Sequence, residues 1–144
     1  MSNRPIRDII RNQKLCIATP GTRVTEAAAL MKNGNIGAVL VVNAGRFVGI
    51  FTERDAVFRV LAEGRDPEAT RVDEVMTHAP RTIGPDRPFG HALHLMFEGG
   101  FRHVPVVENG ELVGIVSQRD ALSKDLAQFE TDVLEREHIA EILG

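Results

Sequence analysis

The sequence has few residues suited to several common kinds of site. It contains no tryptophan and no tyrosine, so its only aromatic residues are seven phenylalanines. Surfaces that stack nucleic-acid bases are therefore scarce. The net charge of −3 also argues against a broad electrostatic grip on nucleic acid, because such binding depends on neutralising many phosphates. Nucleic acid is accordingly the least favoured partner.

Cysteine and long apolar runs are scarce as well. The single cysteine, Cys16, cannot form an internal disulfide, and we expect a buried small hydrophobic residue there. The longest apolar runs have the length of a strand, which predicts no membrane span. The N-terminus lacks the pattern of a signal peptide, so we expect a cytoplasmic protein. His91 and His94 share a predicted helix, but no third ligand has suitable spacing, and no metal site is predicted.

The chain carries an internal repeat with an offset of 65 residues. Residues 25–56 align with residues 90–121 without a gap. Breaker residues at 64–67 mark a linker. We therefore expect one repeat at 7–64, a second at 71–126 and a helical extension at 127–144. The identical pairs include Leu30/Leu95, Met31/Met96, Gly34/Gly99, Val41/Val106, Gly45/Gly110, Gly49/Gly114, Arg54/Arg119 and Asp55/Asp120.

Each copy has the pattern of a helix, two strands and a second helix. Apolar residues at helical spacing predict a first helix that ends at Gly34 or Gly99. Two β-branched runs joined by a turn predict a hairpin. With short extra strands upstream, the fold class is α/β (α+β), two β-α-β-β-α repeats that must pack face to face. The strands are expected at 15–18, 38–42, 47–51, 81–83, 104–107 and 112–116.

The second helix of each copy begins with a capping signal. Thr52 and Ser117 are good N-caps, and Asp55 and Asp120 stand three residues further on, as in a capping box. The basic residues between positions 4 and 14 alternate with apolar ones, which predicts a solvated helix face.

The C-terminal extension is expected to be an amphipathic helix. It either caps the pair of repeats or contacts a second subunit, and capping is the favoured alternative. Its apolar residues are Phe129, Val133, Leu134, Ile139 and Ile142.

These residues resemble the CBS-domain family, named for cystathionine beta-synthase. Its repeats carry an apolar-Pro-Val-Val run, a hairpin, and then Gly-Ile-Val-Ser-x-x-Asp. The second copy shows this pattern at 103–107 and 114–120, and the first at 38–42 and 49–55, with Leu40 where the family often has proline. The resemblance implies a stand-alone tandem pair, a Bateman-type regulatory module related by a pseudo-two-fold axis, with two clefts. Family members commonly bind AMP, ADP, ATP, NAD or S-adenosylmethionine there, and many pairs form homodimers.

The repeated motif suits a nucleotide. A carboxylate can accept hydrogen bonds from both hydroxyls of a ribose, which is the role expected for Asp55 and Asp120. Thr52 and Ser117 lie at helix starts, where exposed N–H groups and the dipole favour an anion. An arginine precedes each aspartate and is expected to contact phosphate. These arginines are Arg54 and Arg119.

The two clefts are expected to be unequal. Only the second copy has basic residues just before its first strand, so its cleft is predicted to prefer the more phosphorylated ligand. That cleft comprises Asp120, Ser117, Arg119, Arg102, His103 and Pro105, completed by the segment around Thr19. The counterpart cleft would use Asp55, Thr52 and Arg54 with the segment around Thr82 and Ile83.

Helix caps that bind nothing have the same Thr-x-x-Asp and Ser-x-x-Asp pattern. The leading hypothesis is a regulatory, non-catalytic sensor of an adenine nucleotide that signals to an unidentified effector protein through a conformational change. The alternative is a ligand-free interaction or dimerisation module. An enzyme acting on nucleotides ranks third, and a nucleic-acid binder fourth.

Overall fold

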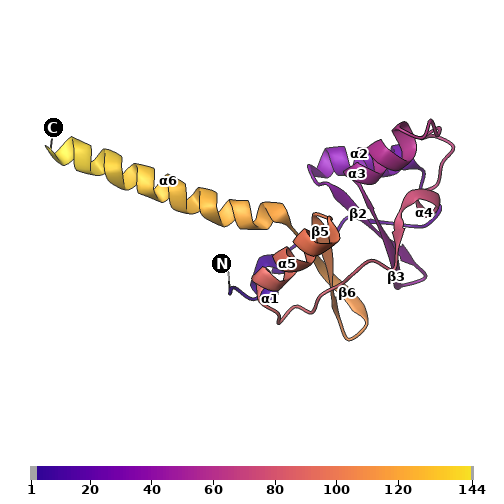
Figure 1. Cartoon of the computed structure of the whole chain (residues 1–144), viewed down its shortest axis with the longest axis horizontal. Coiled ribbons are helices and arrows are strands. Elements are labelled where there is room, and N and C mark those ends of the chain that lie inside the picture. Colours follow the sequence, from indigo (N-terminus) through magenta and orange to yellow (C-terminus); the bar gives the residue numbers. More distant parts are fainter. Residues whose placement is uncertain (1–2, 144) are drawn as a thin grey trace.

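The computed structural model describes residues 3–143, without the side chains of 123–127 and 143. It confirms the expected fold class, with two β-α-β-β-α repeats followed by a long C-terminal helix (Figure 1). Gly144, the last residue of the predicted extension, lies outside the described residues. The elements in order are α1 (Ile6–Ile10), β1 (Ile17–Ala18), α2 (Val24–Gly34), β2 (Ala38–Asn43), β3 (Arg46–Thr52), α3 (Glu53–Asp55), the π-helical η1 (Ala56–Leu61), α4 (Val72–Val75), β4 (Thr77–His78), α5 (Phe89–Gly99), β5 (His103–Glu108), β6 (Glu111–Ser117) and α6 (Gln118–Leu143).

Both hairpins form where the turn residues predict them. β2 pairs with β3 and β5 with β6, in both cases antiparallel. Each loop has two residues with positive φ, Ala44 and Gly45 in the first hairpin and Asn109 and Gly110 in the second. Positive φ at both central positions defines a type I′ turn, whose twist matches that of the strands. The strands consequently extend one residue further into the turn than the sequence indicated.

Alternation along the strands divides the core into three parts. Val39 and Val41 of β2 face the helices of the first repeat, whereas Leu40 between them faces the other repeat. Leu40 packs in a central cluster that includes Leu112 and Ile115 of the second repeat. Because successive strand residues point to opposite faces, a strand buried on both sides is apolar throughout. The central cluster therefore joins the two sheets face to face.

The chain crosses over before each repeat. Ile6 of α1 is fully buried in the core of the second repeat, whereas Val72 and Met76 are buried in the core of the first. Isolated backbone bridges join Pro5 to Pro88 and Arg23 to Arg71, which lie at nearly equivalent positions of the two repeats. Figure 1 shows α1 beside α5, although the two are far apart in the sequence. Each core is thus completed by the segment at the start of the other repeat.

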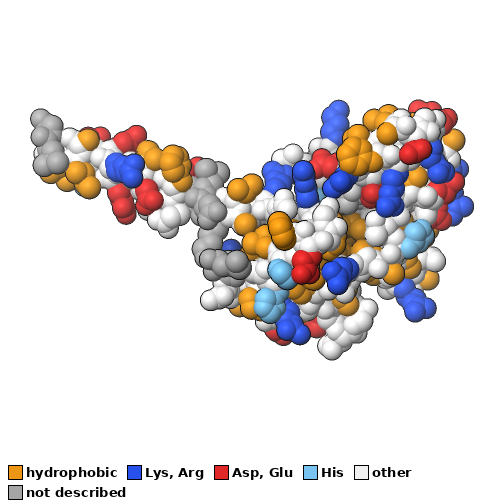
Figure 2. All heavy atoms as spheres, viewed as in Figure 1, with side chains coloured by type: hydrophobic (Ala, Val, Ile, Leu, Met, Phe, Trp, Pro, Cys, Tyr) orange, Lys and Arg blue, Asp and Glu red, His pale blue; other side chains and the backbone are white. Residues whose placement is uncertain are grey.

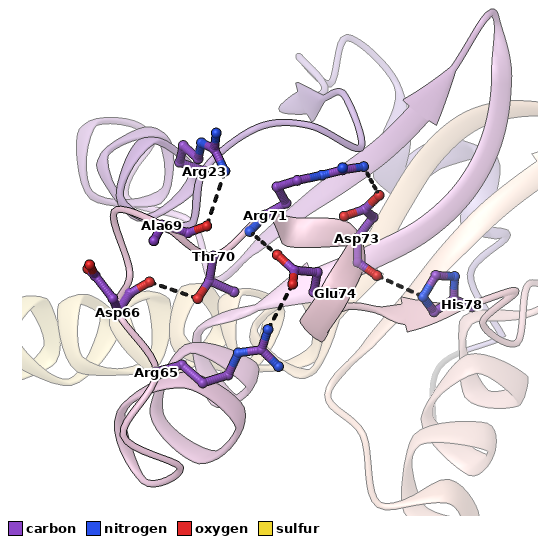
Figure 3. Close-up of polar contacts among 9 residues, drawn as sticks. All are labelled: Arg23, Arg65, Asp66, Ala69, Thr70, Arg71, Asp73, Glu74 and His78. Carbon is purple, nitrogen blue, oxygen red and sulfur yellow. Dashed lines mark hydrogen bonds and ion pairs between the residues drawn. The ribbon is translucent and has the colours of Figure 1, made fainter.

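A polar network holds the linker and α4 against the first repeat (Figure 3). Glu74 accepts a hydrogen bond from the Arg71 N–H at 2.7 Å and pairs with Arg65 at 3.0 Å. Arg23 Nη1 donates to the carbonyl oxygen of Ala69 at 3.1 Å. Most of these groups are exposed, so their contribution to stability is modest. The network fixes the direction of the chain between the repeats.

The edges of the two hairpins are covered in different ways. In the first repeat, β4 pairs with β3 at Gly49 and Ile50, a strand that the sequence pattern did not indicate. In the second repeat, the side-chain amide of Gln13 takes that place. It donates to the Ile115 carbonyl at 2.8 Å and accepts from the Ile115 N–H at 2.9 Å. The expected strand at 81–83 is reduced to a single bridge between Ile83 and Val106.

The basic N-terminal segment is only partly the expected solvated helix face. A helix does form there, but α1 ends at Ile10 and Asn12 has a positive φ of 63°. Arg7 forms ion pairs with Asp86 and Glu108 of the second repeat. These ion pairs hold α1 against the second repeat, in whose core Ile6 is buried.

The expectation that the C-terminal helix caps the pair is wrong. α6 runs without interruption from Gln118 and projects away from the repeats (Figure 1). Its apolar residues do not share one face either. Phe129 and Val133 lie one turn apart, but Leu134 is about 100° further round the helix. Leu134 and Ile142 are 66% and 69% exposed, and Figure 2 shows hydrophobic side chains along both edges of α6.

The crossover predicts a strict requirement for glycine at position 114. A methyl group added there would lie 2.7 Å from Cγ2 of Ile10, a stiff β-branched side chain. Gly114→Ala should therefore destabilise the protein by about 1–3 kcal/mol in urea unfolding. Gly21→Ala is the matched control, because a methyl group at Gly21 meets nothing within 4 Å. Equal unfolding midpoints for the two variants would show that α1 does not pack on β6.

Candidate functional site

The two repeated motifs form helix caps at the ends of β3 and β6. The Thr52 N–H donates to Asp55 Oδ2 at 2.9 Å, and the Asp55 N–H donates back to Thr52 Oγ1 at 3.2 Å. In the second repeat, the Ser117 N–H donates to Asp120 Oδ2 at 2.7 Å. The expected cap at Thr52 is therefore complete, and at Ser117 the hydrogen bond to the Asp120 carboxylate is present. Each cap turns its aspartate back toward the end of its own strand.

The two aspartates differ in how open they are. Asp55 is 8% exposed, and its Oδ1 lies 3.6 Å from Nε of Arg59. Both of its carboxylate oxygens thus have partners within the first repeat. Asp120 is only partly buried. Its carboxylate is the more accessible of the two to a ligand hydroxyl.

Arg54 and Arg119 reach across to the opposite repeat. Arg54 Nη1 donates to the carbonyl oxygen of Gly100 at 3.0 Å, and Arg119 Nη1 to that of Asn35 at 3.5 Å. Gly100 and Asn35 are the left-handed residues that end α5 and α2. A cation is favoured at a helix C-terminus, where carbonyl groups lack partners. The arginines therefore join the two repeats by equivalent contacts, and their expected contact with phosphate stays a prediction.

His103 lies where the two repeats meet, at the start of β5. A methyl group added to Gly37 would lie 3.3 Å from Cε1 of His103 and 2.9 Å from Oε1 of Glu53. The pKa of His103 is lowered by burial, while the negative charges of Glu53 and Asp120 oppose that effect and Arg102 adds to it. The imidazole of His103 is therefore influenced by carboxylates from both repeats. This group of residues is called the boundary cluster below and comprises Arg102, His103, Asp120 and Glu53.

The remaining predicted site residues are Pro105, Ile83, Thr82 and Thr19, and they lie in the sheet or at the surface. Pro105 is buried in β5, and its carbonyl accepts from the Ile83 N–H at 3.1 Å. The Ile83 carbonyl accepts from the Val107 N–H, so both backbone groups of Ile83 are used in the sheet. Thr82 is exposed, and Thr19 is an exposed residue whose hydroxyl lies 3.2 Å from that of Thr22. The structure therefore brings Asp120 and His103 together more directly than it does these four.

The other candidate residues, Cys16 and His94, have contacts typical of structural residues. Cys16 is half-buried against the first core, and burial raises the pKa of its thiol, which disfavours the reactive thiolate. His94 pairs with Glu98 on α5 at 3.0 Å. Within residues 3–143, no group of three side chains is placed to hold a metal ion. No described helix combines the length and apolar character needed to cross a membrane.

Sequence reasoning missed Glu53, and it noted Gly37 only as the residue that stands where the second copy has a basic side chain. Glu53 occupies the motif position that Gln118 occupies in the second copy, and Gly37 corresponds to Arg102. The signal was available as a difference between the copies at these two positions. Only the three-dimensional arrangement shows that Glu53 of one repeat faces His103 of the other.

Comparison with known proteins identifies the same family in both repeats. The family model described as the CBS domain matches the chain twice, at residues 6–62 and 72–127. CBS domain-containing protein CBSCBSPB2 of Arabidopsis thaliana is 36% identical over 122 residues. That alignment covers 84% of this chain but only 23% of the Arabidopsis protein, so the chain spans under a quarter of that relative.

Two solved structures share the fold. A signal-transduction protein with CBS domains from Burkholderia ambifaria has a TM-score of 0.79 and 32% identity, covering 86% of this chain and 95% of that one. CBS domain protein PAE2072 from Pyrobaculum aerophilum, solved in complex with AMP, has a TM-score of 0.73 and 25% identity. The alignment covers 87% of this chain and 99% of that protein.

The lowered pKa of His103 predicts how stability depends on pH. The unfolded chain binds a proton at this residue near its ordinary value of 6.5, whereas the folded protein binds it only at lower pH. Neutral His103 therefore contributes fully to the free energy of unfolding above pH 6.5. This contribution is lost as the pH falls from 6.5 through the lower pKa of the folded protein. His103→Gln should lose less stability than the wild type on acidification from pH 7.5 to 5.5, measured by urea unfolding. Parallel profiles for the two proteins would contradict this assignment.

Proposed function

The chain belongs to the CBS-domain family as a tandem pair, and from this premise we propose that it is a regulatory sensor of an adenine nucleotide. The ligand class is AMP, ADP, ATP or NAD, with S-adenosylmethionine a further member. The nucleotide lies between the repeats and changes their relative tilt, and an effector protein responds to the new shape. In this proposal the chain binds its ligand without catalysing a reaction.

One observation carries the proposal: a partly open carboxylate and two basic side chains meet at the boundary between the repeats. Asp120 can accept hydrogen bonds from the two hydroxyls of a ribose, and Arg102 with His103 can donate to phosphate. The start of α6 lies beside them, and the positive end of its helix dipole favours an anion. The AMP complex of a structural neighbour supports the same ligand class.

The contacts of Arg54 and Arg119 supply a route from the ligand to the fold. Each arginine is adjacent to a proposed ribose-binding aspartate and also contacts the end of a helix in the opposite repeat. A ligand shifts an equilibrium between two shapes only by its difference in affinity for them. A ligand that moves Asp120 therefore also acts on the contact that Arg119 makes with Asn35.

The alternative is a module that binds no ligand and only joins proteins. The capping hydrogen bonds at Thr52 and Ser117 favour it, because they give the motif a structural role by themselves. A thermal-shift screen with the five ligands separates the two. A bound nucleotide at a hundred times its Kd stabilises the protein by about 2.7 kcal/mol. A stable but unresponsive protein would favour the interaction module.

Asp120→Ala should weaken the binding of the best ligand by about tenfold or more in calorimetric titration, because hydrogen bonds to a charged group are lost. Asp55→Ala should have the smaller effect, since Asp55 is buried and engaged by Thr52 and Arg59. Asp132→Ala on α6 removes the same charge at an exposed position and serves as the control. Unchanged affinity in Asp120→Ala would overturn the assignment of the ribose site.

The proposal includes a homodimer. Several large apolar side chains are exposed on the helices of both repeats, and monomers seldom leave extended apolar patches in water. The most exposed on each repeat are Leu61 of η1 at 68% and Phe97 of α5 at 86%. Sedimentation should show a dimer, and Leu61→Glu should shift it toward monomer. A wild-type monomer at micromolar concentration would exclude this part of the proposal.

A further inference from the structure

The first residue of the second helix differs in charge between the repeats. The Glu53 N–H donates to the Gly37 carbonyl at 3.0 Å, and the Gln118 N–H donates to the Arg102 carbonyl at 3.2 Å. The two backbones are thus equivalent around these positions. The side chains are not equivalent, because only the first repeat carries a carboxylate there.

The Glu53 carboxylate lies at the boundary cluster. It and the His103 imidazole approach the same point beside Gly37 from opposite repeats, at 2.9 Å and 3.3 Å from the position of an added methyl group. Glycine at position 37 leaves the space that both side chains use. Glu53 is also the largest single charge effect on the pKa of His103. The distances and the charge effect agree that Glu53 faces His103.

We infer that Glu53 acts as an internal anion beside Arg102 and His103, so that the cleft built around Asp120 selects a monophosphate such as AMP over a triphosphate such as ATP. This inference rests on the proposed function. It also changes the expectation from the sequence, which did not include Glu53 in this cleft and favoured the more phosphorylated ligand. The negative charge of the carboxylate opposes the positive charge of Arg102.

The selectivity follows from charge. A phosphate group carries roughly two negative charges at neutral pH, and a triphosphate carries more. Repulsion from a fixed carboxylate grows with the charge of the ligand. Glu53 is exposed, so solvent screens the effect and it remains moderate. A monophosphate can share the patch with Glu53 at lower cost than a triphosphate can.

Calorimetric titration of Glu53→Gln with AMP and with ATP, in buffer without divalent cations, tests this selectivity. The variant should bind ATP about threefold to tenfold more tightly than the wild type, with a smaller gain for AMP. Glu63→Gln removes the same charge from an exposed position beyond η1 and should match the wild type. An unchanged ratio of ATP to AMP affinity in Glu53→Gln would overturn the inference.

A ligand-free measurement separates this inference from the proposed function. Titration of His103 followed by NMR should give a lower pKa in Glu53→Gln than in the wild type, because the carboxylate no longer stabilises the imidazolium. An unchanged pKa means that Glu53 does not face His103, which overturns the inference but not nucleotide binding. A wild-type protein that binds none of the adenine ligands overturns the proposed function, whatever the pKa of His103.

Discussion

The rest of the structure depends on the crossover that places the start of each repeat in the core of the other. Ile6 is buried in the second core, and Val72 and Met76 are buried in the first. Gly114 lets α1 approach β6, and Gly49 lets the segment after α4 approach β3. Neither repeat has a complete core alone, so the pair folds as one unit. The ends of β3 and β6, with their capped aspartates, are consequently held at a shared boundary.

Local chemistry made much of this fold predictable from the sequence. The turns at Gly45 and Gly110, the caps at Thr52 and Ser117 and the helix ends at Gly34 and Gly99 depend on neighbouring residues alone, and they form where the sequence predicts them. Two other features depend on contacts between residues about a hundred positions apart in the sequence. They are the burial of Ile6 in the second core and the covering of the edge of β6 by Gln13. The course of α6 was predicted wrongly because its apolar residues were read as one face.

The candidate site was likewise predictable only where it depends on neighbouring residues. The repeated motif indicated Asp120, but a sequence does not show which charges oppose each other across two repeats. The structure gives Arg54 and Arg119 acceptors in the opposite repeat, and it places Glu53 against His103. In the proposed function, the boundary combines attraction for a phosphate with a carboxylate that limits it. A ligand bound there would change contacts made by both repeats, which is what a sensor requires.

The central claim is that a nucleotide binds between the repeats rather than on either one. A crystal structure of the chain grown with AMP tests this most directly. The account predicts AMP at the boundary cluster, with its ribose hydroxyls on the carboxylate of Asp120 and its phosphate beside Arg102 and His103. AMP bound outside the boundary between the repeats, or a boundary that stays empty at saturating AMP, would contradict it.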